Sequence, residues 1–444
     1  MKISKFNFFT PFVGDESKII AYNASSNGGA LMSLESYNQY LEFVERDVPI
    51  EDENLLQSLT KGLFLLEDDF DELEVLSLRL KKDRFNNRSM GLTIVPTSDC
   101  NFRCVYCYEK DVISPVYMSD EEQERILRYI ENNMRYLNFF SITWYGGEPM
   151  LAFNIIEKMS QRIMELAKKY DVNYDAMIIT NGYLLKRDII SKLKDLNISR
   201  IQVTLDGSEE SHNKRRPLKG DKPTFEKIIK NLEDNYDILN NVNLRINMDK
   251  ENEDSGEKIL KLLVDKKIIG KITPYIARVT DDNDCYNSGT CITSEDFALK
   301  DFDYLVKTNE VLNIGHRYPK PKTVFCGADR SSSYVINADG KIYKCWCDIG
   351  YEDRAVGTNI ESIDISSKYY IDYMSYDVTK DSKCEDCNIL PICMGGCPIK
   401  RLVDASSDNR CDYNKFHLSK YLNHAFAMQI EHIEKLKHEK VSNL

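Results

Sequence analysis

Three features are missing from this sequence, and each absence excludes a class of protein. No run of apolar residues reaches the roughly 20 that cross a bilayer, which excludes a membrane-spanning protein. Positive charge is in deficit, because 59 Lys and Arg stand against 71 Asp and Glu, a net charge of -12. Since such a surface repels a phosphate backbone, no nucleic-acid partner is expected. The N-terminal residues also lack a secretory signal, so we expect a cytoplasmic protein with no membrane partner.

Cysteine is absent from the first 99 residues and abundant after them. Three cysteines lie within the eight residues 100–107, and eight of the thirteen lie between Cys326 and Cys411. A reducing cytoplasm disfavours a disulfide framework, and core packing does not need so many thiols. We therefore expect most of these cysteines to bind metal, in two separate regions of the chain.

The spacing of apolar residues predicts an α/β protein with several domains, since 444 residues exceed the usual size of one core. Residues 1–90 mix short strands and helices, which favours a winged-helix-like module, the alternative being an extension of the next domain. Residues 91–280 contain six apolar strands, each followed by polar or helical residues. Because parallel neighbours need a crossover, this order predicts a partial (β/α)6 barrel of the TIM type.

The regular alternation stops after residue 280. Residues 281–415 are rich in cysteine and turns, and metal sites can supply the stability that a small core lacks. Residues 416–444 predict a C-terminal helix. In a parallel sheet of this kind, ligands bind at the carboxyl ends of the strands, which is where the notable residues of 91–280 occur.

The first cysteine group follows the first barrel strand. Cys100, Cys104 and Cys107 form a C-x3-C-x2-C array. Three thiolates can hold three irons of a four-iron cluster, which leaves the fourth iron free to bind another ligand. Structural zinc prefers four ligands in paired spacings, so zinc is the weaker alternative.

The array resembles the cluster motif of the radical-SAM superfamily, C-x3-C-x-aromatic-C, with Tyr106 as the aromatic residue. The resemblance implies that the free iron chelates the amine and carboxylate of S-adenosyl-L-methionine (SAM), with Tyr106 near the adenine. Reduction then cleaves SAM and gives a 5'-deoxyadenosyl radical, which abstracts hydrogen from a substrate.

The second strand ends in Gly146, Gly147, Glu148 and Pro149, a motif that contacts the methionyl amine in that superfamily. Glycines let a backbone approach a ligand closely, and a carboxylate can receive an ammonium group. By itself the motif is only a turn. Its position one strand after the cysteines favours the cofactor interpretation.

Further cofactor contacts are expected at the ends of the next strands. Thr180 and Asn181 close the third strand and Asp206 closes the fourth, although each could be turn chemistry alone. After the fourth strand, His212, Arg216 and Pro217 resemble the H-x3-R-P stretch of that superfamily, and Asn247 lies in the fifth strand, facing the same mouth. An arginine suits the methionyl carboxylate, the alternative being a solvated side chain. The neighbouring His212 is equally compatible with a packed histidine.

The second cysteine group has the pattern C-x13-G-x4-C, gap, C-x2-C-x5-C-x3-C, gap, C. A zinc ribbon accounts for only part of it. It resembles the SPASM extension of radical-SAM peptide- and protein-modifying enzymes, which implies three 4Fe-4S clusters in all. By that resemblance Cys326, Cys345 and Cys397 hold auxiliary cluster I. The same resemblance assigns four cysteines to auxiliary cluster II: Cys384, Cys387, Cys393 and Cys411.

Seven ligands for two four-iron clusters leave one iron without a protein ligand. Cys347 lies two residues after Cys345, and Cys285 and Cys291 are further thiols in a polar loop. An open site for a substrate thiol is the other alternative. The sequence leaves this ligand unassigned.

The order of the three parts resembles maturases of ribosomally made peptides, of the sactipeptide and ranthipeptide type. This resemblance implies that residues 1–90 grip the leader of a precursor peptide. It also implies an external electron donor of the flavodoxin or ferredoxin type and formation of a cysteine thioether. Anaerobic sulfatase maturation and a carbon–carbon peptide crosslink are the enzymatic alternatives. A redox-sensing DNA-binding protein is opposed by the acidic charge.

Overall fold

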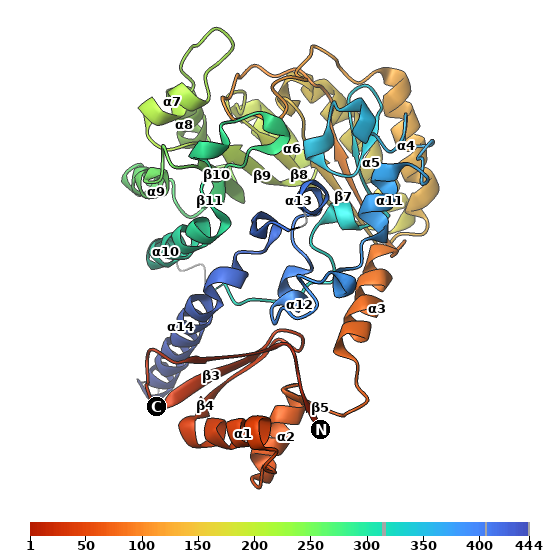
Figure 1. Ribbon diagram of the computed structural model, residues 1–444. Coiled ribbons are helices and arrows are strands. Elements are labelled where there is room, and N and C mark those ends of the chain that lie inside the picture. Colours follow the sequence, from red (N-terminus) through yellow and green to blue (C-terminus); the bar gives the residue numbers. More distant parts are fainter. Residues whose placement is uncertain (313–316, 405, 443–444) are drawn as a thin grey trace.

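The computed structural model describes residues 1–312, 317–404 and 406–442, with side chains described as far as residue 436. A large sheet covered by helices forms one end of the molecule, and the N-terminal sheet and its helices form the other (Figure 1). The cysteine-rich region lies between them. No helix in these ranges is long and apolar enough to cross a membrane.

Six parallel strands form the centre of the large sheet, which confirms the predicted α/β fold. Their order across the sheet is β11-β10-β9-β8-β7-β6, so each strand neighbours the next one in sequence. The strands are β6 (Ser89–Ile94), β7 (Phe139–Trp144), β8 (Asn173–Thr180), β9 (Ile198–Thr204), β10 (Val242–Met248) and β11 (Ile272–Arg278).

The sheet extends beyond the six predicted strands. β12 (Ser333–Ile336) pairs in parallel with β6, and β13 (Ile342–Tyr343) pairs antiparallel with β12. Both short strands come from the cysteine-rich region, where the sequence has no strand-and-helix alternation to predict them. The cysteine-rich region and the barrel therefore share one hydrogen-bonded sheet.

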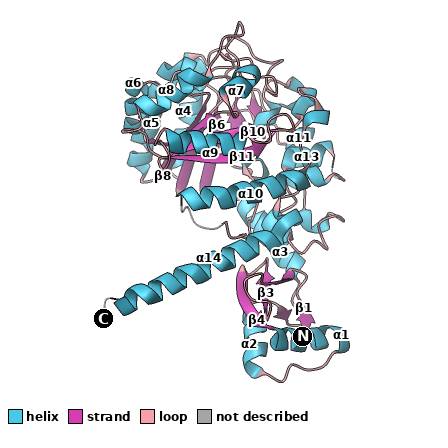
Figure 2. Ribbon diagram, turned by 90° about the vertical axis from the view of Figure 1, so that its left-hand side faces the viewer, coloured by secondary structure: helices cyan, strands magenta, loops and turns pink. Residues whose placement is uncertain are grey.

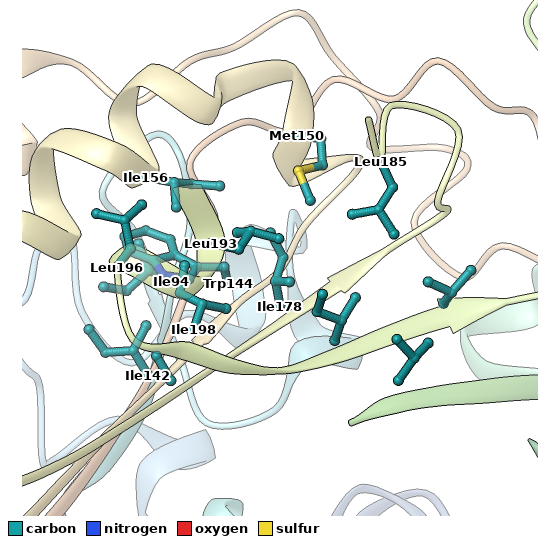
Figure 3. Packing of buried hydrophobic residues seen from close by; sticks show 14 of the residues in the cluster. Ile94, Ile142, Trp144, Met150, Ile156, Ile178, Leu185, Leu193, Leu196 and Ile198 are labelled. Carbon is teal, nitrogen blue, oxygen red and sulfur yellow. The ribbon is translucent and has the colours of Figure 1, made fainter. Parts of the chain in front are cut away.

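The core lies between the central strands and their crossover helices. Strand residues such as Ile94, Ile142 and Trp144 interdigitate with helix residues such as Ile156 and Leu193 (Figure 3). The helices following the strands are α4 (Asp120–Met134), α5 (Phe153–Tyr170), α6 (Arg187–Asp195), α7 (Glu209–Arg215), α8 (Phe225–Asp234), α9 (Ser255–Asp265) and α10 (Ser294–Leu312). This packed layer holds the carboxyl ends of the strands in fixed positions.

The N-terminal part contains a three-stranded antiparallel sheet in the order β2-β3-β4. Its elements are β1 (Lys2–Ile3), β2 (Asn7–Pro11), β3 (Lys18–Asn23), β4 (Gly28–Ser33), α1 (Leu34–Arg46), α2 (Glu53–Lys61), β5 (Leu65–Leu66) and α3 (Glu72–Arg84). One side of this part forms a core around Met32, Tyr40 and Leu59. On the other side, Ile20 and Tyr22 share a core with the cysteine-rich region.

The cysteine-rich region has little regular structure. Its helices are α11 (Lys368–Ser375), α12 (Leu390–Cys393) and α13 (Pro398–Val403). The long α14 (Asn414–Ser442), with non-helical backbone at His417, runs past the N-terminal sheet (Figure 2). The Thr10 hydroxyl of β2 hydrogen-bonds to the Ser419 hydroxyl, and the Val13 N–H just after β2 donates to Asn423 Oδ1, both in α14.

Candidate active site

A cavity of about 250 Å³ opens at the carboxyl ends of the parallel strands. The segments after all six strands, or the ends of the strands themselves, contribute to its wall. The predicted site residues that line it are Cys100, Cys104, Tyr106, Cys107, Gly146, Gly147, Thr180, Asn181, Arg216 and Asn247. Glu148, Pro149 and Asp206 do not line it and lie behind the wall.

The loop that carries the three cysteines is fixed by backbone hydrogen bonds. The Cys107 N–H donates to the Cys104 carbonyl (3.2 Å), and the Arg103 N–H donates to the Pro217 carbonyl (2.8 Å). The Val105 N–H donates to the Arg215 carbonyl (3.0 Å). Because these bonds join the loop to residues 215–217, they place Arg216 beside the thiols.

The donor set of this cavity fits a four-iron cluster with one open iron. Cys100, Cys104 and Cys107 line the wall, and no fourth cysteine or histidine does so among the described residues. Burial raises the pKa of all three thiols, and bound metal would hold them as thiolates. No group of three Cys, His, Asp or Glu side chains in the described ranges is tight enough for a single metal ion. That spacing is compatible with a cluster, since each thiolate binds a different iron.

Gly146 and Gly147 lie so close to the neighbouring backbone that no side chain would fit at either position. A Cβ on Gly147 would lie 2.2 Å from the Asp99 carbonyl oxygen, just before the first cysteine. Gly146 has φ +115°, and a Cβ there would lie 2.8 Å from the Thr97 carbonyl oxygen. Both glycines therefore allow the loop after β7 to pack directly against the cysteine loop.

Glu148 lies behind the cavity wall and stabilises it through hydrogen bonds. Its carboxylate accepts hydrogen bonds from the Thr180 hydroxyl (2.7 Å), the Asn181 N–H (2.7 Å) and the Met150 N–H (3.0 Å). Burial raises the pKa of Glu148, and these donors oppose the rise. Pro149 begins the buried turn that follows, η1 (Pro149–Ala152). The geometry gives Glu148 a positioning role for the end of β8.

Tyr106 is the centre of a polar network on the opposite wall. Its hydroxyl donates to Asp206 and accepts from Arg216 Nη1 (2.7 Å) and Asn247 Nδ2 (2.9 Å). Asp206 also accepts from the Asn247 N–H (3.1 Å). The Nε of Arg216 is buried and has no hydrogen-bond partner among the described residues. An anionic ligand in the cavity can use that donor.

His212 is a packed histidine. It is fully buried, its Nδ1 accepts from the Asp206 N–H (3.0 Å), and its Nε2 therefore carries the proton toward the Thr224 hydroxyl (3.1 Å). That hydroxyl donates to the Arg216 carbonyl (2.7 Å). Burial lowers the pKa of His212 well below its usual value. The neutral ring thus supports both Asp206 and Arg216.

Several lining residues were not predicted from the sequence. Arg245 and Gln202 lie two residues before Asn247 and Thr204, so strand alternation could have placed them on the same face. Glu109 lies two residues after Cys107, and burial raises its pKa to about 8. Trp346 comes from the cysteine-rich region, and only the three-dimensional fold brings it here.

The sequence of this site matches a known family over much of the barrel. The profile of the Radical SAM superfamily matches residues 94–263. The chain contains a radical SAM domain. The match covers the cysteine loop and the ends of β7 to β10, which form most of the cavity wall.

Two curated relatives of this radical SAM protein are similar over most of its length. A cysteine-type anaerobic sulfatase-maturating enzyme of Clostridium novyi is 24% identical over 355 residues, which cover 70% of this chain and 88% of the relative. The radical SAM cyclopropyl synthase TigE of Paramaledivibacter caminithermalis is 24% identical over 348 residues, covering 72% of this chain and 70% of TigE.

Two solved structures share the fold. The structure of anSMEcpe with bound AdoMet and the Cp18Cys peptide has a TM-score of 0.58 at 20% identity, covering 78% of this chain and 99% of anSMEcpe. Streptococcus suis SuiB bound to the precursor peptide SuiA has a TM-score of 0.56 at 17% identity, covering 92% of this chain and 99% of SuiB. The fold therefore extends beyond the radical SAM domain in both comparisons.

Proposed function

We propose that this protein is a radical SAM enzyme that installs a cysteine thioether in a ribosomally made precursor peptide. The observation that carries the radical chemistry is the meeting of Cys100, Cys104 and Cys107 with Gly147 and Arg216 in one cavity. A peptide substrate is supported by the two fold neighbours, since anSMEcpe is bound to the Cp18Cys peptide and SuiB to the precursor peptide SuiA.

Different residues of the cavity would bind the cluster and SAM. The three thiols would hold the first cluster, and the backbone at Gly146 and Gly147 with the free Nε of Arg216 would bind the methionyl end of SAM. When bound, the cluster and SAM supply a 5'-deoxyadenosyl radical. Asn247, Asp206 and Tyr106 keep Arg216 in position, and Thr180 and Asn181 shape the facing wall.

The proposed leader site is the outer edge of β4. Gly29 and Ala30 are exposed there, and no further strand pairs with β4 in the described ranges. At the opposite edge, side chains of α14 occupy polar groups next to β2. An extended leader can add to an open edge through main-chain hydrogen bonds. The larger share of this chain that SuiB covers is consistent with a leader-bearing substrate.

Thioether formation requires an electron acceptor in addition to the radical. Abstraction of a hydrogen atom leaves a carbon radical, and attack by a cysteine thiolate forms the carbon–sulfur bond and releases one electron. The thiol proton goes to solvent or a base. Two auxiliary clusters held by the cysteine-rich region would receive the electron, and a flavodoxin or ferredoxin would reduce the first cluster.

Sulfatase maturation is the second candidate function. It is favoured by one observation, namely that the alignment covers 88% of the Clostridium novyi sulfatase-maturating enzyme. That reaction oxidises an active-site cysteine of a sulfatase to formylglycine, and the residue loses its sulfur. The two candidates therefore differ in whether the substrate keeps its sulfur.

Mass spectrometry of the precursor after anaerobic co-expression tests the proposal. A peptide encoded beside this gene should lose two hydrogen atoms per crosslink, keep its sulfur, and resist alkylation at the linked cysteine. Fragmentation should place the link between that cysteine and a carbon of another residue. An unchanged peptide, or one that loses sulfur, would contradict the thioether assignment.

Substitution of Cys104 tests the radical chemistry separately. Cys104→Ala should abolish 5'-deoxyadenosine formation after dithionite reduction while auxiliary clusters remain, because the first cluster loses one of its three ligands. Chromatography of the nucleoside measures this. Cys291→Ala is the matched control, since Cys291 does not line the cavity, and it should cleave SAM at the wild-type rate. Undiminished cleavage by Cys104→Ala would place the reactive cluster elsewhere.

A further inference from the structure

Three aromatic side chains from separate segments contact one another in the lining of the active-site cavity. Tyr108 belongs to the cysteine loop, and Tyr145 follows β7. Their hydroxyls hydrogen-bond to each other. Trp346 comes from the cysteine-rich region, and its ring centre lies 5.3 Å from that of Tyr145. We call Tyr108, Tyr145 and Trp346 the aromatic wall.

The turn after β13 fixes the backbone of Trp346 but leaves its ring accessible. Trp346 begins the short helix η5 (Trp346–Asp348), and its carbonyl accepts from the Ile349 N–H (3.2 Å). Asp348 is fully buried and accepts a hydrogen bond from the Tyr373 hydroxyl (3.0 Å). The Trp346 side chain is 41% exposed, and no described residue accepts a hydrogen bond from its indole N–H. Both the ring and this donor are therefore available to a ligand.

The charged residues of the cavity lining lie outside the aromatic wall. Arg216 follows β9, Arg245 lies in β10, and Arg278 ends β11. Two carboxylates, Glu109 and Asp282, line the cavity beside these three cations. A cationic substrate side chain would therefore meet an excess of like charge, and an anionic one would be drawn toward the arginines. Because burial of an unpaired charge is costly, the aromatic wall suits an apolar or aromatic side chain.

We propose that the aromatic wall binds the substrate residue that gives up hydrogen, and that this residue has an apolar or aromatic side chain. This inference rests on the proposed function, since it presumes a peptide substrate. Trp346 and Tyr145 are then specificity-determining residues, because their rings pack against that side chain. The indole N–H of Trp346 donates to a main-chain carbonyl of the peptide. The polar lining remains free for SAM.

The position of the aromatic wall suits the residue that reacts. Tyr108 directly follows Cys107 of the first cysteine group, and Trp346 directly follows Cys345 of the second. A side chain held between these two rings therefore lies between the cysteine loop and the cysteine-rich region. The proposed reaction needs its residue in this position, because that residue first loses a hydrogen atom and its carbon radical then releases an electron.

A double-mutant cycle between enzyme and peptide tests the proposal. The precursor peptide encoded beside this gene is titrated calorimetrically into the anaerobic enzyme, with SAM present and no reductant. Trp346→Ala, or alanine at the peptide residue that mass spectrometry shows to react, should each weaken peptide binding by about 10- to 50-fold. Both changes together should weaken it about as much as one alone, because they remove the same contact. Effects that multiply would show independent sites and overturn the proposal.

Matched variants separate contact with the peptide from other roles of Trp346. Trp346→Phe keeps an aromatic ring and should weaken peptide binding by no more than about fivefold. Tyr136→Ala should bind as the wild type does, since Tyr136 is 58% exposed and does not line the cavity. The affinity for SAM should stay unchanged in all three enzyme variants. Weakened SAM binding by Trp346→Ala, with unchanged peptide binding, would assign the aromatic wall to SAM and refute the proposal.

A change in the peptide alone covers the case in which Trp346→Ala loses iron or unfolds. Aspartate at the reacting position should weaken binding to the wild-type enzyme by at least about 10-fold, because its charge would be buried without a partner. Equal affinity for this peptide would overturn the proposal, and so would a natural thioether to a charged residue. Loss of sulfur from the product would instead contradict the proposed function, and the binding cycle would still test the aromatic wall.

Discussion

Single residues of the cavity act mainly through close packing, and Gly147 is the clearest case. Gly147→Ala should weaken SAM binding by about 5- to 150-fold, because the added Cβ meets a backbone oxygen and overpacking costs about 1–3 kcal/mol. Equilibrium binding of SAM to the anaerobic protein measures this. Gly289→Ala is the control, since its Cβ meets only the end of the Asn287 side chain, at 3.1 Å. Equal affinities in the two variants would show that the loop after β7 yields without cost.

The buried His212 predicts a pH dependence of stability. Its pKa in the folded protein is depressed, so the unfolded chain binds the extra proton first as pH falls. The contribution of neutral His212 to the free energy of unfolding is complete above the unfolded-state pKa of about 6.5. Below that pH it is lost, by up to about 1.4 kcal/mol per pH unit. As the pH is lowered from about 7.5 to 5.5, the melting temperature should fall more steeply for the wild type than for His212→Gln. Parallel curves would contradict this role.

The sequence predicted which residues gather at the cavity but not which of them line it and which support the wall from behind. Strand ends identified Thr180, Asn181 and Asn247 as neighbours, because parallel strands end at one edge, and the resemblance to the H-x3-R-P stretch identified Arg216. The carboxylate of Glu148 accepts hydrogen bonds from Met150, Thr180 and Asn181, and the sequence did not predict these partners. Such pairing depends on contacts between strands, which periodicity does not report.

Among the secondary-structure elements, β4 carries the proposed recognition of the leader. Hydrogen–deuterium exchange of the full enzyme should show residues 28–33 protected when a leader peptide is added, because main-chain hydrogen bonds replace bonds to water. Residues 7–11 of β2 serve as the internal control and should exchange as before. Protection confined to β2, or to neither strand, would refute the assignment of the leader to β4.

Elements with strong periodicity were predictable, and elements defined by a partner were not. The six barrel strands are apolar runs followed by crossover helices, so the local pattern suffices. β12 has four residues and β13 has two, and they are strands only because β6 offers an edge beside them. Without that edge, the same residues predict no more than a turn-rich segment.

For the whole molecule, the N-terminal part and the cysteine-rich region are expected to depend on each other. Ile20 and Tyr22 share a core with Cys384 and Cys393, more than 360 residues away in sequence. Ile20→Asp should therefore reduce the iron content toward about eight per chain, because burying an unpaired charge costs several kcal/mol and disrupts the site of auxiliary cluster II. Val13→Asp is the control, since Val13 is 84% exposed. Full iron content in Ile20→Asp would contradict this dependence.

The pairing of β12 with β6 limits how such an enzyme can be recombined with its relatives. Four residues of the cysteine-rich region hydrogen-bond to the strand that leads to Cys100. A chimera joined between the barrel and this region must carry β12 and β13 along with the barrel, or it leaves β6 as an open edge that invites aggregation. A crossover point that keeps β6 paired therefore lies after Tyr343, so that Cys326 stays with the barrel and Cys345 comes with the foreign cysteine-rich region.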